Sequence, residues 1–384
     1  MCEEKISKLE LFQPSFASEL QDAILELEHL RRMSLTGTTP GFIFYQLKAL
    51  FHTLESLGSA RIEGNRTTLS EYIEGAVTEK IKQSEQITEI ANLEIALKYI
   101  DDNITKGSII TGSFIRELQA IAVKDLTSEG DRNAGSYRNC NVSISGSTHT
   151  PPNPLLVPAL MSDLIDFINR NDPPKYDLIK VALVHHRFGW IHPFANGNGR
   201  TVRLLTYAML MKYGFNVDTA GRILNPTAVF CCNRDKYYEM LSIADTGTSE
   251  GVEQWCLYVL SGILEERKKL DILTDYKQVV SKLLAPAVSS AVTRGLINAD
   301  DAAILNFVIE NRTVTTGEVA AKFKIKGTSA TYRLNKLKSE QLINPIEPKK
   351  RQYVPNLNCR KLIYGLIDSL SKNGFIPENL LVDR

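Results

Sequence analysis

Apolar residues recur at intervals of three and four along most of the chain, which is the spacing of one face of an α-helix. Residues with high helix propensity fill the polar positions between them. The stretches with this pattern lie at 19–33, 45–58, 87–102, 113–126, 157–170, 177–191, 201–214, 234–247 and 250–284. The pattern therefore predicts a body that is mainly α-helical.

One stretch departs from the helical pattern. Residues 135–155 contain the alternating segment NVSIS, several Gly, Ser and Thr residues, and closing prolines. Alternation with turn-forming residues is typical of paired strands. We therefore predict a short β-hairpin here, followed by an extended segment.

The C-terminal part has a different texture. Three short helical stretches at 300–311, 315–324 and 328–342 precede the segment 343–356, which could close as a two-stranded wing. Between Lys322 and Lys361 there are eleven Lys or Arg residues against two Glu, although the net charge of the whole chain is only +1. This local excess predicts a separate module with an anionic partner.

Composition narrows the class of protein. With 384 residues, 43% hydrophobic and 23% charged, the chain resembles an ordinary globular protein of two or three domains. Its longest apolar run, 204–211, is too short to span a bilayer, and no signal peptide is recognisable, so we expect a cytoplasmic protein with no membrane partner. The six cysteines lack metal-site spacing, which favours reduced, buried thiols.

The segment from His192 to Arg200 is a loop between two predicted helices, with two glycines just before the second helix. Such a turn can direct backbone N–H groups and the positive end of a helix dipole at a phosphate. Arg200 and Arg203 are three residues apart, so both can reach phosphate oxygens from one side of the first turn. His192 suits proton transfer near neutral pH. The alternative interpretation is a glycine-rich helix connection with a structural histidine.

This segment resembles the signature of the Fic (filamentation induced by cAMP) family, His-Pro-Phe-x-Asp/Glu-Gly-Asn-Gly/Lys-Arg followed by x-x-Arg, at every position except the acidic one. The flanking sequence is similar too, with His185, His186 and Trp190 before the loop and GSYR and PPNP further upstream. The resemblance covers roughly residues 40–270. It implies a Fic-type helical bundle with a β-hairpin flap that can align a target segment by strand addition.

The resemblance also implies an activity, the transfer of AMP from ATP to a Ser, Thr or Tyr hydroxyl of an unknown target protein. His192 would be the general base that takes the hydroxyl proton. Phe194 would anchor the loop in the core. Gly199 would favour nucleotidyl transfer, because family members that phosphorylate their targets have Lys at this position.

The remaining loop residues would bind the nucleotide. By resemblance, Gly197, Asn198 and Gly199 would form the anion-binding turn. Arg200 would hold the inner phosphates of ATP and Arg203 the γ-phosphate.

Asn196 stands where the family has an acidic residue that positions Mg²⁺. Its amide oxygen could still contact the metal, but it lacks the charge that helps to hold Mg²⁺. The expectation is therefore a Mg²⁺-dependent site with a weakened metal-side residue.

Residues 59–65 resemble the inhibitory motif of the family, Ser/Thr-x-x-x-Glu-Gly/Asn, with Ser59 and Glu63 at its two defining positions. A glutamate that reaches Arg203 would compete with the γ-phosphate for the guanidinium group. Taken alone, a Glu before Gly at a helix end is more often a solvated or capping residue.

Residues 313–351 resemble a winged helix-turn-helix, whose second helix would lie in the major groove of DNA while the wing near Lys349 to Arg351 contacts phosphates. A protein-contact module is the alternative. The predicted domains are 1–110, a helical region with the inhibitory motif; 111–285, the catalytic core; and 299–384, the winged-helix-like module with a C-terminal helix. A homodimer is possible within the resemblance.

Two alternatives to an adenylyltransferase stay open at this point. One is a nucleotide-binding regulator with little turnover, because Asn196 replaces the acidic residue. The other is an enzyme that removes AMP from a modified target at the same site.

Overall fold

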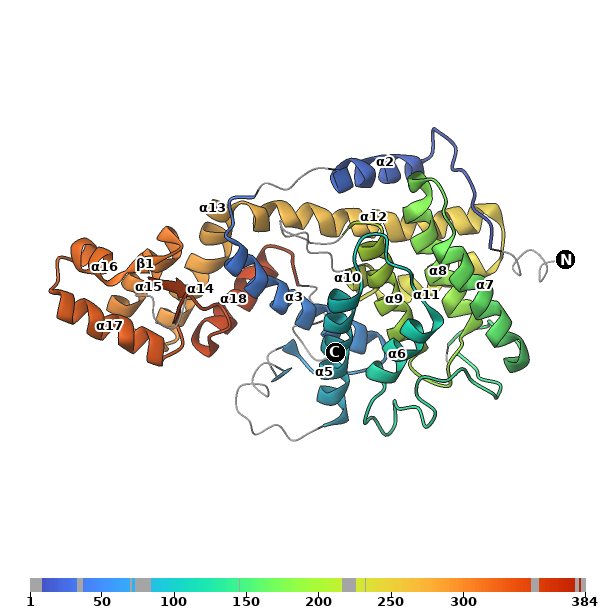
Figure 1. Cartoon of the computed structure of the whole chain (residues 1–384), viewed down its shortest axis with the longest axis horizontal. Coiled ribbons are helices and arrows are strands. Elements are labelled where there is room, and N and C mark those ends of the chain that lie inside the picture. Colours follow the sequence, from blue (N-terminus) through green and yellow to red (C-terminus); the bar gives the residue numbers. More distant parts are fainter. Residues whose placement is uncertain are drawn as a thin grey trace.

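A computed structural model describes residues 9–32, 37–69, 71–72, 84–144, 146–215, 226–231, 233–346, 352–376 and 380. Most of these residues are helical, as the apolar spacing predicted (Figure 1). None of the described helices is long and apolar enough to cross a membrane. Of the four described cysteines, three are buried as expected, whereas Cys140 is exposed.

Helix α9 (Asn198–Lys212) lies at the centre of the body, and its residues are buried on every side. It packs against five helices: α3 (Gly41–Ile62), α5 (Glu85–Asn103), α6 (Gly112–Ala122), α8 (Asp177–Ile191) and α10 (Pro226–Cys231). Most of its side chains are apolar, and these must be enclosed by other helices, because an exposed face would leave apolar surface in water. The first turn of α9 is therefore surrounded by neighbouring helices.

The outer layer is organised by α12 (Ser249–Thr274). This helix packs against α8 and against two further helices, α2 (Glu19–Arg32) and α11 (Arg234–Asp245). The fully buried Trp255 fixes its position by donating a hydrogen bond of 2.7 Å to the carbonyl of Ala182 in α8. Helix α7 (Val157–Asn169) covers the other side of α8, and two short turns, η1 (Pro154–Leu156) and η2 (Pro174–Tyr176), lead into α7 and α8.

The prediction of one continuous helix over 250–284 is wrong. Helix α12 ends at Thr274, because the side chain of Asp275 accepts a hydrogen bond from the backbone N–H of Lys277 and caps a new start. The chain then continues through α13 (Tyr276–Gln278), the π-helical turn η3 (Val279–Leu284) and α14 (Ala285–Thr293).

The β-hairpin predicted within 135–155 is also wrong: the described residues of this stretch contain no paired strands, and Ser147 N–H donates to the carbonyl of Ile144. The reason is the buried side chain of Arg138. Its guanidinium group donates to the carbonyls of Cys140 at 3.0 Å and Pro152 at 2.6 Å, so a side chain ties the two legs together where a strand ladder would otherwise do so.

The C-terminal part combines helices α15 (Ala299–Asn311), α16 (Thr316–Phe323) and α17 (Gly327–Ser339) with a three-stranded antiparallel sheet in the order β1-β3-β2. The strands are β1 (Val314–Thr315), β2 (Ile343–Pro345) and β3 (Gln352–Pro355); Val314 pairs with Tyr353 and Asn344 with Val354. Helix α18 (Arg360–Lys372) then returns to pack on α14.

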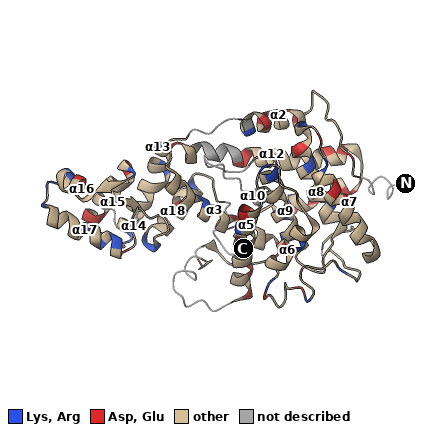
Figure 2. Ribbon diagram, in the orientation of Figure 1, with Lys and Arg blue, Asp and Glu red and all other residues tan. Residues whose placement is uncertain are grey.

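Some of the cations in this C-terminal part are paired with acidic neighbours. Figure 2 shows both signs of charge among α15 and α17. Arg333 pairs with Asp300 at 3.2 Å and Lys336 with Asp301 at 2.5 Å, so two cations of α17 bind their own chain. The predicted wing tip, Lys349 to Arg351, lies outside the described residues.

Candidate active site

The loop between α8 and α9 begins with a sharp change of direction at His192. This residue has φ 50° and ψ 61°, the left-handed conformation that an L-residue adopts only when its surroundings enforce it. Phe194, fully buried, anchors the loop in the core, as predicted. The buried Asn198 side chain closes the turn, because it accepts from the backbone N–H of Phe194 and donates to its carbonyl, both at 2.9 Å.

The first residues of the loop are held by hydrogen bonds from Arg138, which lies outside the loop in sequence. Its Nε donates to the carbonyl of His192 at 2.8 Å and its Nη2 to the carbonyl of Ile191 at 3.3 Å, while its own N–H donates to the carbonyl of Pro193 at 2.9 Å. The sequence analysis assigned no role to this residue. The signal was its position in GSYR, a lone arginine in a stretch rich in Gly, Ser and Asn.

His192 is suited to act as a base. Burial lowers its pKa to about 4, and this effect outweighs the opposing influence of the Gly189 carbonyl and Glu63. The imidazole is therefore neutral near pH 7. Its Nδ1 lies 3.4 Å from the carbonyl oxygen of Gly189; if this nitrogen carries the hydrogen, Nε2 is left with a free lone pair.

The two loop glycines are required for different reasons. Gly197 has φ 78°, and a Cβ at this position would lie 2.5 Å from a methyl group of Val123. Gly199 has no such backbone demand, but a Cβ there would lie 2.2 Å from Oε1 of Glu63. Gly199 thus leaves the space that the Glu63 carboxylate occupies.

Arg203 is 2% exposed, and its guanidinium group is held by Ser59 in the last turn of α3 and by Glu63, the first residue after that helix. Nε donates to Oγ of Ser59 at 2.8 Å, and Nη2 donates to the Ser59 carbonyl at 3.0 Å and to Oε1 of Glu63 at 2.7 Å. Burial opposes ionisation of Glu63, but the charges of Arg203 and Arg200, with the hydrogen bond from Arg203, together hold the Glu63 pKa below its usual range. The carboxylate is therefore ionised and paired at neutral pH.

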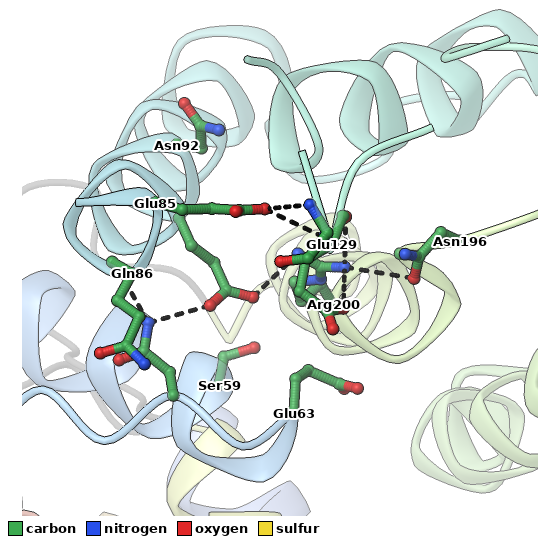
Figure 3. A network of polar contacts seen from close by, with 12 residues as sticks. Ser59, Glu63, Glu85, Gln86, Asn92, Glu129, Asn196 and Arg200 are labelled. Carbon is green, nitrogen blue, oxygen red and sulfur yellow. Dashed lines mark hydrogen bonds and ion pairs between the residues drawn. The ribbon is translucent and has the colours of Figure 1, made fainter. Parts of the chain in front are cut away.

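Arg200 points to a different set of partners, so the expectation that both arginines fork onto one anion is not met in this arrangement. Its Nη1 donates to Oε1 of Glu89 at 2.8 Å, and its Nη2 to the carbonyl of Glu129 at 3.0 Å (Figure 3). Arg200 is 1% exposed, and its Nε has no hydrogen-bond partner in the described part of the chain. Carboxylates from the chain itself thus occupy both arginines of the loop.

Asn196 does not present itself as a metal ligand. Its Oδ1 accepts from the backbone N–H of Gly197 at 2.7 Å and lies 3.4 Å from Nη2 of Arg200, beside a cation that would repel Mg²⁺ (Figure 3). Across the described residues, no cluster of three or more His, Cys, Asp or Glu side chains is placed to hold a metal ion. In this arrangement Asn196 therefore offers Mg²⁺ no charged ligand, and the ion would depend on the phosphates of a bound nucleotide for most of its ligands.

A cavity of about 140 Å³ joins His192 to Arg203. One end is formed by Glu63, Asn198, Gly199 and Arg203, next to the first turn of α9; the rest is lined largely by ring and apolar side chains. The residues of that second part are Ile144, His149, His186, Trp190, Tyr237, Tyr238 and Leu241. Without Glu63, the Arg203 end would be cationic, and with the aromatic part it would suit a phosphorylated aromatic ligand. With Glu63 in place, the volume is below the roughly 300–1,000 Å³ of typical ligand sites.

Comparison with known proteins agrees with this arrangement. Residues 109–210, which include α6, α8, the loop and most of α9, match the model of the Fic/DOC family. The chain is 34% identical over 194 residues to protein adenylyltransferase Fic of Nematostella vectensis, a match covering 49% of this chain and 42% of the relative. The protein of the same name from Aedes aegypti is 29% identical over 201 residues, covering 51% and 37%. These matches thus span less than half the length of either relative.

Two solved structures share the fold. A Fic family protein from Desulfovibrio desulfuricans superposes with a TM-score of 0.54 at 20% identity, covering 90% of this chain and 97% of that one. Fic-1 from C. elegans superposes with a TM-score of 0.50 at 19% identity, covering 66% and 73%. At these identities the likeness concerns the arrangement of helices.

Proposed function

Because residues 109–210 carry a Fic/DOC domain, we propose that this protein transfers AMP from ATP to a hydroxyl side chain of a target protein and that Glu63 holds it inactive. One observation carries the proposal. A neutral histidine and a buried arginine line the same cavity, and the arginine is paired with a carboxylate from a separate helix.

The chemistry follows from these positions. Nε2 of His192 takes the proton of the target hydroxyl, and the resulting oxygen attacks the α-phosphorus of ATP. The bond from this phosphorus to the oxygen bridging it to the β-phosphorus breaks, and pyrophosphate leaves. The first turn of α9, at Asn198 and Gly199, offers backbone N–H groups and the positive end of the helix dipole to the phosphates. Arg203 binds the terminal phosphate once Glu63 leaves it.

Glu63 acts as a brake by charge competition. A carboxylate and a phosphate both seek the Arg203 guanidinium group, and the carboxylate is already seated at 2.7 Å. The small cavity volume supports the same view, because the Glu63 side chain takes space at the phosphate end. Arg200 can hold the inner phosphates only after it exchanges Glu89 and Glu129 for them.

The test is intact-protein mass spectrometry of wild type, Glu63→Gly and Glu63→Gly/His192→Ala, each incubated with ATP and Mg²⁺. We expect an AMP-sized mass gain in Glu63→Gly alone. ATP labelled at the α- or at the γ-phosphate distinguishes adenylyl from phosphoryl transfer, since only the α-label should be retained. If Glu63→Gly/His192→Ala retains as much α-label as Glu63→Gly, His192 is not the base of the reaction.

If Glu63→Gly binds ATP without any transfer, to itself or to proteins of a cell extract, the nucleotide-binding regulator becomes the better interpretation. An AMP-modified extract treated with wild type tests the reverse reaction. Loss of AMP from it would favour the de-adenylylating enzyme.

The C-terminal part supports a second, separate role. Helices α15, α16 and α17, with β1 between the first two and β2 and β3 after the third, are an arrangement that a winged helix-turn-helix would have, and we propose DNA as its partner through residues 313–351. The exposed face of α17 presents Tyr332 and Lys338, since Arg333 and Lys336 are paired within the chain. Binding to duplex DNA that weakens steeply with salt, and weakens further in Lys338→Ala, is the expected result. Salt-independent or undetectable binding would favour a protein partner.

A further inference from the structure

The chain just beyond Glu63 is fastened to helix α5 through Asn65. This side chain is 5% exposed, and its Nδ2 donates to the carbonyl of Gln86 at 2.8 Å and to Oε2 of Glu89 at 2.9 Å. Its Oδ1 accepts from the backbone N–H of Thr67 at 3.0 Å. The Asn65 side chain therefore stabilises its own turn through Oδ1 and binds helix α5 through Nδ2.

Glu89 is the junction of this contact with the catalytic loop. One carboxylate oxygen accepts from Asn65, and the other accepts from Arg200, which is held in turn by Glu129 (Figure 3). All three side chains are buried, with 5%, 4% and 1% of Asn65, Glu89 and Arg200 exposed. In such surroundings a lost partner is not replaced by water, so the contacts form and break together.

We propose that Asn65, through Glu89 and Arg200, is a second anchor of the brake: it fixes the end of α3 and so keeps Glu63 on Arg203. The inference rests on the proposed function of Glu63. Neither Asn65 nor Glu89 lines the cavity, so the anchor acts on the brake segment and not on the nucleotide directly.

The backbone explains how the anchor reaches Glu63. The N–H groups of Glu63 and Asn65 both bond to the carbonyl of Ala60, and Gly64 between them has φ +99°, a conformation of a helix end. A last helical turn frays easily unless a contact outside the helix holds it. Asn65 supplies that contact one residue after the turn.

The decisive variant is Asn65→Ala in the full chain. Two readouts are taken: AMP transfer from α-labelled ATP, and hydrogen–deuterium exchange of the peptide covering residues 59–69. We expect faster exchange in that peptide and roughly tenfold more transfer than in wild type, on the scale of one or two buried hydrogen bonds. In the Glu63→Gly background, Asn65→Ala should add nothing, because both changes release the same brake.

Asn92→Ala is the matched control. Asn92 is also a buried asparagine, 6% exposed, and donates a hydrogen bond of 2.7 Å to a backbone carbonyl, that of Lys124, from the same helix α5 (Figure 3). It removes a similar interaction without touching the brake segment. We expect it to lower the melting temperature while transfer and exchange in residues 59–69 stay at the wild-type level.

Asn65→Asp keeps the size of the side chain and places a carboxylate 2.9 Å from that of Glu89, so it serves if the alanine variant does not fold. Its expected result is the same release. The inference is overturned if Glu63→Gly transfers AMP faster than wild type but a folded Asn65 variant transfers it only at the wild-type rate. It is also overturned if Asn92→Ala raises the transfer rate as much as Asn65→Ala does. If Glu63→Gly transfers no AMP, the proposed function has failed. In that case, unchanged hydrogen–deuterium exchange of residues 59–69 in Asn65→Ala overturns by itself the proposal that Asn65 anchors the end of α3.

Discussion

Replacing Gly199 by alanine should release the brake without altering any residue of it. The added Cβ would lie 2.2 Å from Oε1 of Glu63 and 3.1 Å from Nη1 of Arg203. The crowded atom is the far end of a flexible side chain, so Glu63 can yield while the backbone of α9 stays in place. Gly199 is helical and does not have a positive φ, and alanine in a helix is favoured over glycine by about 0.5–1 kcal/mol.

The size of the effect follows from the contact that is lost. Glu63 and Arg203 share a charge-assisted hydrogen bond of 2.7 Å in a site where their side chains are 25% and 2% exposed. Such a bond contributes about 1.5–3 kcal/mol, which corresponds to a change of roughly 10- to 150-fold in an equilibrium constant. Transfer by Gly199→Ala should rise by a factor within that range, and the affinity for ATP should rise with it.

The assay compares initial rates of AMP transfer and ATP dissociation constants for wild type, Gly199→Ala, Glu63→Gly and the double variant. Gly317→Ala, at an open position in the first turn of α16, controls for helix propensity and should transfer at the wild-type rate. The double variant should match Glu63→Gly. A double variant much slower than Glu63→Gly would show that the methyl group obstructs the nucleotide and would refute the reasoning.

Three further outcomes are expected. Burial lowers the pKa of His192 from 6.5 to about 4, so this histidine takes up a proton at higher pH in the unfolded chain than in the folded protein. The free energy of unfolding should therefore fall by about 2 kcal/mol between pH 7 and pH 5. Thermal unfolding of His192→Gln should show a smaller fall over the same pH range. In the Glu63→Gly background, Asn196→Asp should increase transfer at low Mg²⁺, because its carboxylate would supply the charged ligand for a phosphate-bound Mg²⁺ that the Asn196 amide lacks; a Mg²⁺ titration with no change would contradict this. Arg138→Ala removes the side-chain donor to four backbone carbonyls and should lower the free energy of unfolding in urea by about 2–4 kcal/mol. Arg138→Lys should restore little of it, because lysine lacks the planar guanidinium group that reaches several carbonyls at once.

Local patterns were sufficient wherever short-range physics decides the structure. The spacing of apolar residues predicted most helices of the body. The turn after His192 lies between two of them as expected, although the second helix begins at Asn198 and not at Thr201. Glycine at 197 and the core position of Phe194 were also recognisable, because backbone freedom and apolar burial are properties of single residues.

Patterns misled where one side chain replaced a regular element. The alternation in 135–155 predicted a hairpin, but Arg138 satisfies the carbonyls that a partner strand would have used. Strand β1 was not foreseen, because two residues carry no periodicity and only their pairing with β3 makes them a strand.

The sequence by itself determined the loop that follows His192, its resemblance to the Fic signature, and the side chains available there for the proposed chemistry. The resemblance also predicted that Glu63 would reach Arg203, 140 residues away, and the structure contains that contact. Only the tertiary structure decided that Arg200 meets Glu89, 111 residues away. Both pairs lie in the enclosed first turn of α9, where an arginine excluded from water must find an anion. Spacing along the chain cannot say whether that anion is a phosphate or a carboxylate of the protein, because the choice depends on which helices pack against α9.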